Sequence, residues 1–407
     1  MIKKLDYSLE GRKLESKVFG EVNISGSKSE SNRLLILQHF FPSLKLKNLS
    51  NSDDTKYLQK ALESDEEVID ISHAGTAMRF LTAYFSAKPG REVILTGSDR
   101  MQNRPIGILV DALKHLGADI SYADKEGYPP LRIKGKNLVE EEVDIQGDVS
   151  SQYISALLLT ASSLENGLRL NLTGKVTSIP YINMTLALLR QVGIPCHWKA
   201  NSIIVEPMTE VSPKNLTVES DWSSASYFYS LVALSEGGEL SLSAYKENSL
   251  QGDSSLAEIY AHFGVETIFQ KDRIVLKKTA TELQPLILDL SDSPDLAQTI
   301  AVTCFGMGIA CELSGLHTLK IKETDRLVAL ETELGKLGAD ISVTDKSLHL
   351  RASNKILSNV SIDTYDDHRM AMAFAPLSLK VPIVINDAEV VTKSYTDFWK
   401  DFESVIH

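Results

Sequence analysis

The stretch DALKHLGADISYAD, Asp111–Asp124, contains a helical pattern that ends at a glycine and continues directly into an alternating strand. A second stretch, ETELGKLGADISVTD at Glu331–Asp345, has the same order and the same LGAD junction. Glycine suits the left-handed conformation that often closes a helix, and the alternation after it suits a strand with one buried face. Each stretch therefore predicts an α-helix followed by a β-strand.

Two further stretches, at residues 186–200 and 256–270, repeat this pattern of helix, glycine and strand. The four glycines, at positions 117, 193, 264 and 338, are separated by 76, 71 and 74 residues. This spacing indicates an internal repeat, with about six units of roughly 68 residues in the chain. Helices and strands that alternate in long units predict an α/β (α+β) protein, with two lobes that divide near Val218–Ala225.

The composition is that of a large globular protein with an acidic balance. Of the 407 residues, 43% are hydrophobic and 24% are charged, and the formal net charge is -12. Such a chain can bury a large core, and its length favours two domains. Acidity argues against nucleic acid binding, which needs a broad basic face. The longest apolar stretch, about residues 296–311, is too short to span a membrane. We therefore expect the protein to bind neither nucleic acid nor a membrane.

The cysteines and the first residues indicate a cytoplasmic protein. Cys196, Cys304 and Cys311 are an odd number in apolar surroundings, which suits reduced core thiols better than a disulfide framework. The first 14 residues contain no apolar run typical of an export signal. We therefore expect a cytoplasmic location.

Two short stretches gather cations against the acidic average: KETDR at Lys322–Arg326 and DDHRMAM at Asp366–Met372. Such local clusters attract anions, so we expect a substrate that carries phosphate or carboxylate. Lys322 and Arg326 are four residues apart, and we expect them to share one face of a helix. An exposed ladder of ion pairs is the alternative.

Glycine- and serine-containing turns lead into apolar helices in the first half of the chain, at residues 24–37, 73–81 and 147–159. A helix N-terminus offers free N–H groups to an anion, although the same residues also suit ordinary helix caps. The GK dipeptides at 135, 174 and 335 lack the following Ser or Thr of a P-loop, so nucleotide hydrolysis loses support. Metal-ligand spacing is missing too, so we expect no catalytic metal.

Nine short motifs follow one another along the chain: GSKSESNR, HAGTAMR, RMQNRP, VSSQ, DWSSASYF, SPDLAQTIA, KETDR, DHRMAM and TKSY. Their order resembles that of the 3-phosphoshikimate 1-carboxyvinyltransferase (EPSP synthase) family over nearly the whole chain. The resemblance implies an inside-out α/β barrel of two domains, each with three βαβαββ units. Residues 27–218 would form the first domain, which mainly binds shikimate 3-phosphate. Residues 1–26 and 219–407 would form the second, which completes the phosphoenolpyruvate site and the catalytic groups.

The resemblance also implies an activity. Members of the family transfer the enolpyruvyl group of phosphoenolpyruvate to the 5-hydroxyl of shikimate 3-phosphate and release phosphate, in the route to chorismate and aromatic amino acids. They use no cofactor, and glyphosate occupies the phosphoenolpyruvate site. The two substrates are therefore the expected partners, and a monomer is the expected state. We expect basic groups of both lobes to meet in a cleft between them.

The resemblance assigns residues to each substrate. Those expected to hold shikimate 3-phosphate are Lys28, Ser29, Arg33, Ser150, Ser151, Gln152, Ser178, Tyr181, Asp295 and Lys322. Those expected to hold phosphoenolpyruvate are Lys28, Gly75, Arg104, Gln152, Glu323, Arg326, His368, Arg369 and Lys393. The expected catalytic groups are Asp295, Glu323, Lys28 and His368.

Among the catalytic groups, Asp295 is the expected base that takes the proton of the 5-hydroxyl. Either Glu323 or Lys28 exchanges the methylene proton of phosphoenolpyruvate, and the choice between them stays open.

Two rival interpretations remain from the sequence. The sister enzyme UDP-N-acetylglucosamine enolpyruvyl transferase shares the fold and the donor, but it typically has a reactive cysteine in the loop where this chain reads GSDRMQNRP. No cysteine precedes Pro195 in this chain. A noncatalytic anion-binding relative is the second rival, and the joint presence of Asp295, Glu323 and Lys28 argues against it.

Overall fold

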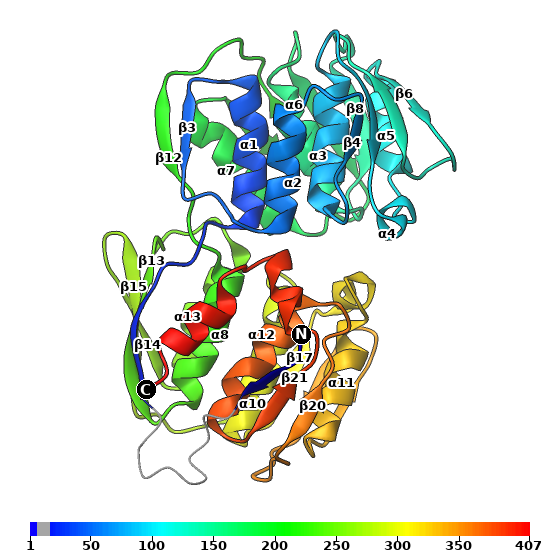
Figure 1. Cartoon of the computed structure of the whole chain (residues 1–407). Helices are drawn as coiled ribbons and strands as arrows, with labels where there is room; N and C mark the ends of the chain where they lie inside the picture. The colour runs from blue at the N-terminus through cyan, green and yellow to red at the C-terminus, as the bar shows by residue number, and fades with distance from the viewer. Residues whose placement is uncertain (6–16) are drawn as a thin grey trace. The chain divides into compact units, whose positions relative to one another are not determined.

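The computed structural model describes residues 1–5 and 17–407, which form two compact units (Figure 1). Unit 1 comprises Met1–Ser25 and Glu219–His407, and unit 2 comprises Gly26–Val218. The prediction that the first 14 residues contain no export signal falls largely on residues 6–16, which lie outside the described part of the chain. Both units combine helices with mixed sheets, which confirms the predicted α/β class. No helix in the described part of the chain has the length and apolar character needed to cross a membrane.

Four sheets, two in each unit, share one strand order. The first and second strands are parallel, and the third and fourth form an antiparallel hairpin whose fourth strand lies against the second. Helices lie between the first and second strands and between the second and third; in one segment of unit 1, which starts with β2 (Lys17–Val22), the residues of unit 2 come between the first strand and its helix. This is the βαβαββ segment expected from the resemblance, and its repetition explains the regular spacing of the four glycines.

Unit 2 contains two complete βαβαββ segments. The first consists of β4 (Val68–Asp70), α3 (Gly75–Ser86), β5 (Glu92–Thr96), the short α4 (Asp99–Gln102), α5 (Gly107–His115), β6 (Asp119–Tyr122) and β7 (Leu131–Lys134). The second consists of β8 (Glu142–Gln146), α6 (Ser151–Ala161), β9 (Leu168–Thr173), α7 (Ile179–Val192), β10 (Cys196–Lys199) and β11 (Ser202–Val205).

Unit 1 also contains two complete segments. The first consists of β2 (Lys17–Val22), α8 (Trp222–Leu234), β13 (Gly237–Ser243), η1 (Gly252–Ser255), α9 (Leu256–Ala261), β14 (Val265–Phe269) and β15 (Arg273–Lys278). The second consists of β16 (Leu286–Asp289), η2 (Pro294–Leu296), α10 (Ala297–Met307), β17 (Cys311–Ser314), η3 (His317–Ile321), α11 (Arg326–Lys336), β18 (Ile341–Val343) and β19 (Leu348–Leu350).

Among the described residues, the third sheet of each unit has fewer strands than the other two. It joins segments from opposite ends of the unit's sequence. In unit 2 the elements are α1 (Lys28–Phe40), β3 (Leu44–Lys47), α2 (Asp53–Glu63) and β12 (Lys214–Thr217), with β3 parallel to β12. In unit 1 they are β1 (Lys3–Leu5), β20 (Val360–Ile362), α12 (His368–Phe374), η4 (Ala375–Leu379), β21 (Ile383–Ile385), η5 (Ala388–Lys393) and α13 (Phe398–Ser404). Here β21 pairs with both β1 and β20.

Helices lie inside each unit and sheets cover them. Every residue of α3 is buried, and so is every residue of α8 except Ser223, whereas β8 and β9 alternate buried residues with more exposed ones. In unit 2, α1, α2 and α3 lie side by side (Figure 1), and α6 packs against α3 and α7. This layering is the expected inside-out arrangement. All three cysteines are buried free thiols, as predicted.

The four repeat glycines all have positive φ, from 73° at Gly264 to 102° at Gly117 and Gly193. Strands β6, β10, β14 and β18 follow them. The sequence-based prediction of left-handed helix ends is therefore confirmed.

Alanine at Gly264 or Gly338 separates two energetic costs within unit 1. A methyl group at Gly338 would meet Leu357 at an ordinary contact distance of 3.4 Å. Gly338→Ala should therefore cost only the strain of a left-handed alanine, about 1–2 kcal/mol. At Gly264 the methyl would lie 2.5 Å from the carbonyl oxygen of Thr279, so the backbone must also move. Urea unfolding should show a larger loss for Gly264→Ala, and equal losses would contradict this reading of the site.

Candidate functional site

In unit 1, the carboxylate of Asp295 meets three cations. Asp295 lies in η2, directly before α10. Its Oδ1 accepts a hydrogen bond from Arg326 Nη1 at 2.7 Å and lies 3.5 Å from Lys322 Nζ. Its Oδ2 accepts from Arg369 Nη2 at 3.0 Å. Cations from two separate segments of the chain, at residues 322–326 and at the start of α12, thus converge on one largely buried acid.

Arg326 is the centre of this cluster. Its side chain is only 2% exposed, and it contacts three carboxylates. Nε donates to Asp367 Oδ2 at 2.6 Å, Nη2 donates to Glu323 Oε2 at 2.7 Å, and Nη1 donates to Asp295. Burial acts to lower the pKa of Arg326, but the carboxylates of Asp367, Glu323 and Asp295 together raise it above its ordinary value. The guanidinium therefore stays charged and fixed.

The prediction that Lys322 and Arg326 share a helix face is wrong. Helix α11 begins only at Arg326, because Asp325 caps it by accepting a hydrogen bond from the Val328 N–H at 3.3 Å. Lys322 and Glu323 therefore precede the helix. The two cations still meet, because both side chains reach Asp295.

A second acid, Asp367, connects Arg326 to the start of α12. Asp367 is fully buried, and its Oδ1 accepts from the Arg369 N–H at 2.9 Å, which caps α12. His368, also buried, is the first residue of that helix. Its Nδ1 lies 3.9 Å from Asp367 Oδ1.

The turn before α12 has an unusual backbone. Tyr365 and Asp366 both have positive φ, 53° and 58°, which costs energy in residues other than glycine. Lys393, in η5, holds this turn by donating to the carbonyl oxygen of Asp366 at 2.8 Å and pairing with its carboxylate at 2.7 Å. Lys393 thus lies on the turn that leads to His368 and Arg369.

In unit 2, Arg33 joins three helices. Nε donates to Thr185 Oγ1 on α7 at 2.8 Å, Nη2 donates to Ser155 Oγ on α6 at 3.0 Å, and Nη1 donates to the Ser29 carbonyl on α1 at 2.8 Å. Burial lowers the pKa of Arg33 to about 10. Arg33 therefore connects α1, α6 and α7 inside unit 2, and its expected contact with a substrate stays a prediction.

Other predicted residues of unit 2 also lie at helix starts. Ser150 caps α6, and Gln152 Nε2 donates to Thr76 Oγ1 on α3 at 3.3 Å. Ser178 precedes α7 with a φ of 55°, and the Tyr181 carbonyl accepts from Arg33 at 3.5 Å. The remaining predicted residues are the first or second of their helices: Lys28 and Ser29 in α1, and Ser151 in α6.

Gly75 and Arg104 are in close contact. Gly75 is the first residue of α3, and a methyl group there would lie 2.4 Å from Arg104 Nη1. Arg79, one turn later, donates to the carbonyl oxygens of Gly75 at 3.2 Å and Pro105 at 3.1 Å. Burial first, and then the nearby Arg104, lowers the pKa of Arg79 to about 10. Two arginines therefore flank the start of α3.

Several residues of these clusters were missing from the sequence-based site. Asp367 and Arg79 lie in quoted motifs, but nothing local marks them as buried partners. Thr185 and Ser155 are ordinary helical residues that only the packing of α6 and α7 brings to Arg33. The expected cleft that gathers groups of both lobes stays a prediction.

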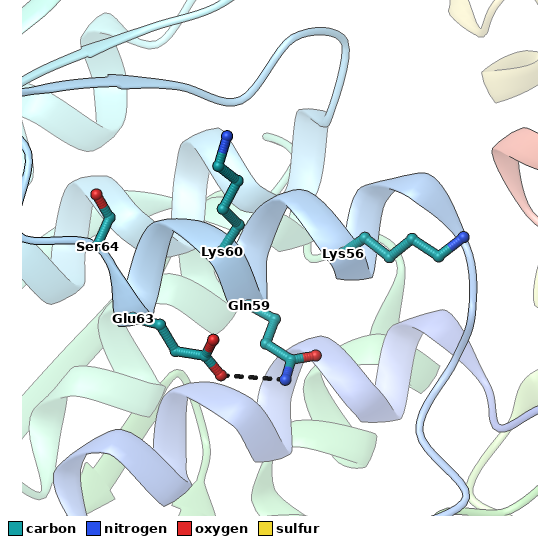
Figure 2. Close-up of a pocket in the computed structure, with 5 residues that line it drawn as sticks. All are labelled: Lys56, Gln59, Lys60, Glu63 and Ser64. Carbon is teal, nitrogen blue, oxygen red and sulfur yellow. Dashed lines mark hydrogen bonds between the residues drawn. The ribbon is translucent and has the colours of Figure 1, made fainter.

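A pocket on α2 is separate from these clusters (Figure 2). Lys56, Gln59, Lys60, Glu63 and Ser64 line it. Gln59 Nε2 donates to Glu63 Oε1 at 3.1 Å. None of the residues that line this pocket is assigned to a substrate by the sequence, and we assign the pocket no role. Within residues 1–5 and 17–407, no group of three or more His, Cys, Asp or Glu side chains is placed to hold a metal ion.

The fold and the clustered cations define a two-unit inside-out α/β protein with sites suited to small anions. A family model described as EPSP synthase (3-phosphoshikimate 1-carboxyvinyltransferase) matches residues 46–402. The 3-phosphoshikimate 1-carboxyvinyltransferase of Bacteroides fragilis strain YCH46 is 47% identical over 392 residues, 95% of each chain. That of Vibrio campbellii is 35% identical over 420 residues, 96% of this chain and 97% of the relative. The chain belongs to the EPSP synthase family.

A solved structure supports the fold independently of close sequence identity. An EPSP synthase from Acinetobacter baumannii superposes with a TM-score of 0.82 at 20% identity, and the match covers 100% of this chain and 98% of that one. The inside-out architecture is therefore shared at low sequence identity.

Replacing Arg326 should strongly destabilise unit 1. Arg326→Gln leaves the buried Asp367 carboxylate without its cation, which typically costs about 3–5 kcal/mol. Arg351→Gln is the matched control, because Arg351 and its partner Asp340 are both exposed and such a pair contributes at most about 1 kcal/mol. Denaturant unfolding of both variants checks this, and similar small losses would argue against Arg326 as the centre of the cluster.

Proposed function

We propose that this enzyme transfers the enolpyruvyl group of phosphoenolpyruvate to the 5-hydroxyl of shikimate 3-phosphate, giving 5-enolpyruvylshikimate 3-phosphate and phosphate. Membership of the EPSP synthase family supports this activity. The structural observation that carries it is the convergence of Lys322, Arg326 and Arg369 on Asp295. This arrangement supplies one proton acceptor among groups that attract phosphate and carboxylate.

We assign shikimate 3-phosphate mainly to the helix starts of unit 2. Free N–H groups and hydroxyls at the starts of α1, α6 and α7 suit a phosphate and a polyhydroxyl ring. The proposed contacts there are Lys28, Ser29, Arg33, Ser150, Ser151, Gln152, Ser178 and Tyr181, and Asp295 and Lys322 of unit 1 join them.

We assign phosphoenolpyruvate to arginines and their neighbours. Planar guanidinium groups bind carboxylate and phosphate through two parallel hydrogen bonds, each worth roughly 1.5–3 kcal/mol when charged. The proposed contacts are Lys28, Gly75, Arg104, Gln152, Glu323, Arg326, His368, Arg369 and Lys393. Substrate would take over part of the hydrogen bonding that these cations now direct to Asp295 and Glu323.

The proposed reaction proceeds by addition and elimination. The 5-hydroxyl oxygen bonds to the middle carbon of phosphoenolpyruvate while Asp295 takes its proton, and the methylene carbon gains a proton and becomes a methyl group. The bond to the phosphate oxygen then breaks, and the methyl group returns a proton as the double bond re-forms. Neighbouring cations favour the ionised carboxylate of Asp295, which is the form that can accept a proton. Glu323 and Lys28 both stay candidates for the methylene proton.

Orientation supplies more of the rate than proton transfer. Holding two reactants in attack geometry contributes on the order of 7–11 kcal/mol, whereas a general acid or base contributes roughly a hundred- to ten-thousand-fold. The fixed guanidinium of Arg326 and the capped start of α12 serve that orientation.

The direct test is release of phosphate by the purified protein with both substrates, and identification of the product by mass spectrometry. We expect release only when shikimate 3-phosphate and phosphoenolpyruvate are present together. Turnover with UDP-N-acetylglucosamine in place of shikimate 3-phosphate would favour the sister activity. Absence of turnover with either acceptor would reject the proposed function.

Asp295→Asn should remove most of the rate while it keeps the shape of the side chain. We expect kcat to fall by about a hundred- to ten-thousand-fold, because the amide cannot accept the hydroxyl proton. Asp292→Asn makes the same charge change three residues earlier on an exposed side chain, and it should leave kcat near that of the parent. A kcat for Asp295→Asn within a few-fold of the parent would exclude Asp295 as the base.

Gly75→Ala should weaken phosphoenolpyruvate binding. The added methyl group displaces the Arg104 guanidinium, so we expect the KM for phosphoenolpyruvate to rise roughly tenfold and inhibition by glyphosate to weaken. Gly335→Ala is the control, because its methyl group would face open space on α11. Unchanged constants for Gly75→Ala would refute the proposed contact between Arg104 and phosphoenolpyruvate.

The monomeric state and the cytoplasmic location stay predictions. Light scattering by the purified protein over a range of concentrations tests the first.

A further inference from the structure

Two residues outside the assigned substrate contacts, Ser223 and Asp253, are linked to the Arg369 guanidinium by hydrogen bonds. Ser223 is the second residue of α8, and Asp253 lies in η1. Arg369 Nη2 donates to Asp295 Oδ2 at 3.0 Å and to Ser223 Oγ at 3.3 Å. The Ser223 hydroxyl in turn donates to Asp253 Oδ2. A chain of hydrogen bonds thus runs from Asp253 through Ser223 to Arg369.

The direction of this chain follows from the inventory of donors. A serine hydroxyl has one hydrogen to donate and two lone pairs that accept. Because Asp253 accepts that hydrogen, the lone pairs of Ser223 are available to the cation of Arg369. A carboxylate at position 253 therefore orients the hydroxyl so that it supports Arg369.

We propose that Ser223 and Asp253 are positioning residues that fix the Arg369 guanidinium for the anionic group of the substrate. The inference rests on the proposed function, because it takes Arg369 as a phosphoenolpyruvate contact. Arg369 is the second residue of a seven-residue helix, and its Nη1 makes a long 3.4 Å contact with the Asp295 carbonyl. Two-point binding of a carboxylate or phosphate requires a fixed guanidinium plane, and Ser223 supplies an anchor from a different helix.

The charges around Asp253 make the positioning pH-dependent. Burial first, and then the nearby Asp295, raises the pKa of Asp253 to about 6, against the opposing effects of Arg369 and Ser223. Asp221 adds a smaller raising effect. As the pH falls through this value, Asp253 binds a proton and loses the negative charge that attracts the Arg369 guanidinium. The neutral carboxyl accepts the Ser223 hydrogen more weakly than a carboxylate does, so Arg369 is held less firmly.

Removal of the Ser223 hydroxyl tests the link to substrate binding. We expect Ser223→Ala to raise the KM for phosphoenolpyruvate about fivefold to tenfold and to leave the KM for shikimate 3-phosphate within about twofold. The control is Ser230→Ala, which removes a buried hydroxyl on the same helix that accepts a hydrogen bond from Thr303 Oγ1 at 2.8 Å. Equal KM values for phosphoenolpyruvate in the two variants would overturn the inference.

Asp253→Asn separates the hydrogen bond from the titration. The amide keeps an oxygen that accepts from Ser223 but carries no charge at any pH, so the KM for phosphoenolpyruvate at alkaline pH should exceed that of the parent several-fold. Between about pH 8 and pH 5.5 the ratio of the parent KM to the Asp253→Asn KM should rise several-fold, toward one, because the parent carboxyl becomes neutral like the amide. Ionisation of the substrates cancels in this ratio, because both proteins meet the same substrates. A ratio that stays constant with pH would contradict the role of Asp253.

A readout without turnover keeps this inference distinct from the proposed function. Carbon-13 NMR of aspartate carboxyl groups, assigned with Asp253→Asn, follows the titration of Asp253 directly. Ser223→Ala and Arg369→Gln should each move that titration to higher pH, because Ser223 and Arg369 both lower the pKa of Asp253. These shifts in a protein without turnover would reject the proposed function and retain the chain of hydrogen bonds. Turnover without these shifts would reject the positioning role alone.

Discussion

The buried guanidinium of Arg326 is the interaction on which the site of unit 1 depends. It contacts carboxylates that come from η2, from the segment before α11 and from the start of α12. Transfer of these charges out of water is costly, and only close complementary geometry offsets it. Arg326 therefore fixes how three segments pack, and their packing brings Lys322 and Arg369 to Asp295.

Unit 2 also buries an arginine, but the groups that accept its hydrogen bonds are uncharged. Arg33 is equally buried, but its partners are the hydroxyls of Thr185 and Ser155 and the backbone oxygen of Ser29. Because these groups carry no charge, burial lowers the pKa of Arg33, whereas carboxylates raise that of Arg326.

The limits of prediction are clearest at the DDHRMAM motif. Asp366 and Asp367 are neighbours of the same residue type, and no local signal separates them. In the fold, Asp367 is buried against Arg326 and caps α12, while Asp366 takes a positive φ and pairs with Lys393. At KETDR the four-residue spacing suggested a helix face, but the cap at Asp325 starts the helix later.

The sequence by itself determined the repeat, the fold class and the family. Helix ends at glycine and alternating strands are local features, because they depend on φ and on side-chain periodicity within a few residues. Only the tertiary structure decided which charges are paired. Asp295 and Arg369 are 74 residues apart, so their contact depends on how buried helices pack and on the cost of leaving a charge unpaired.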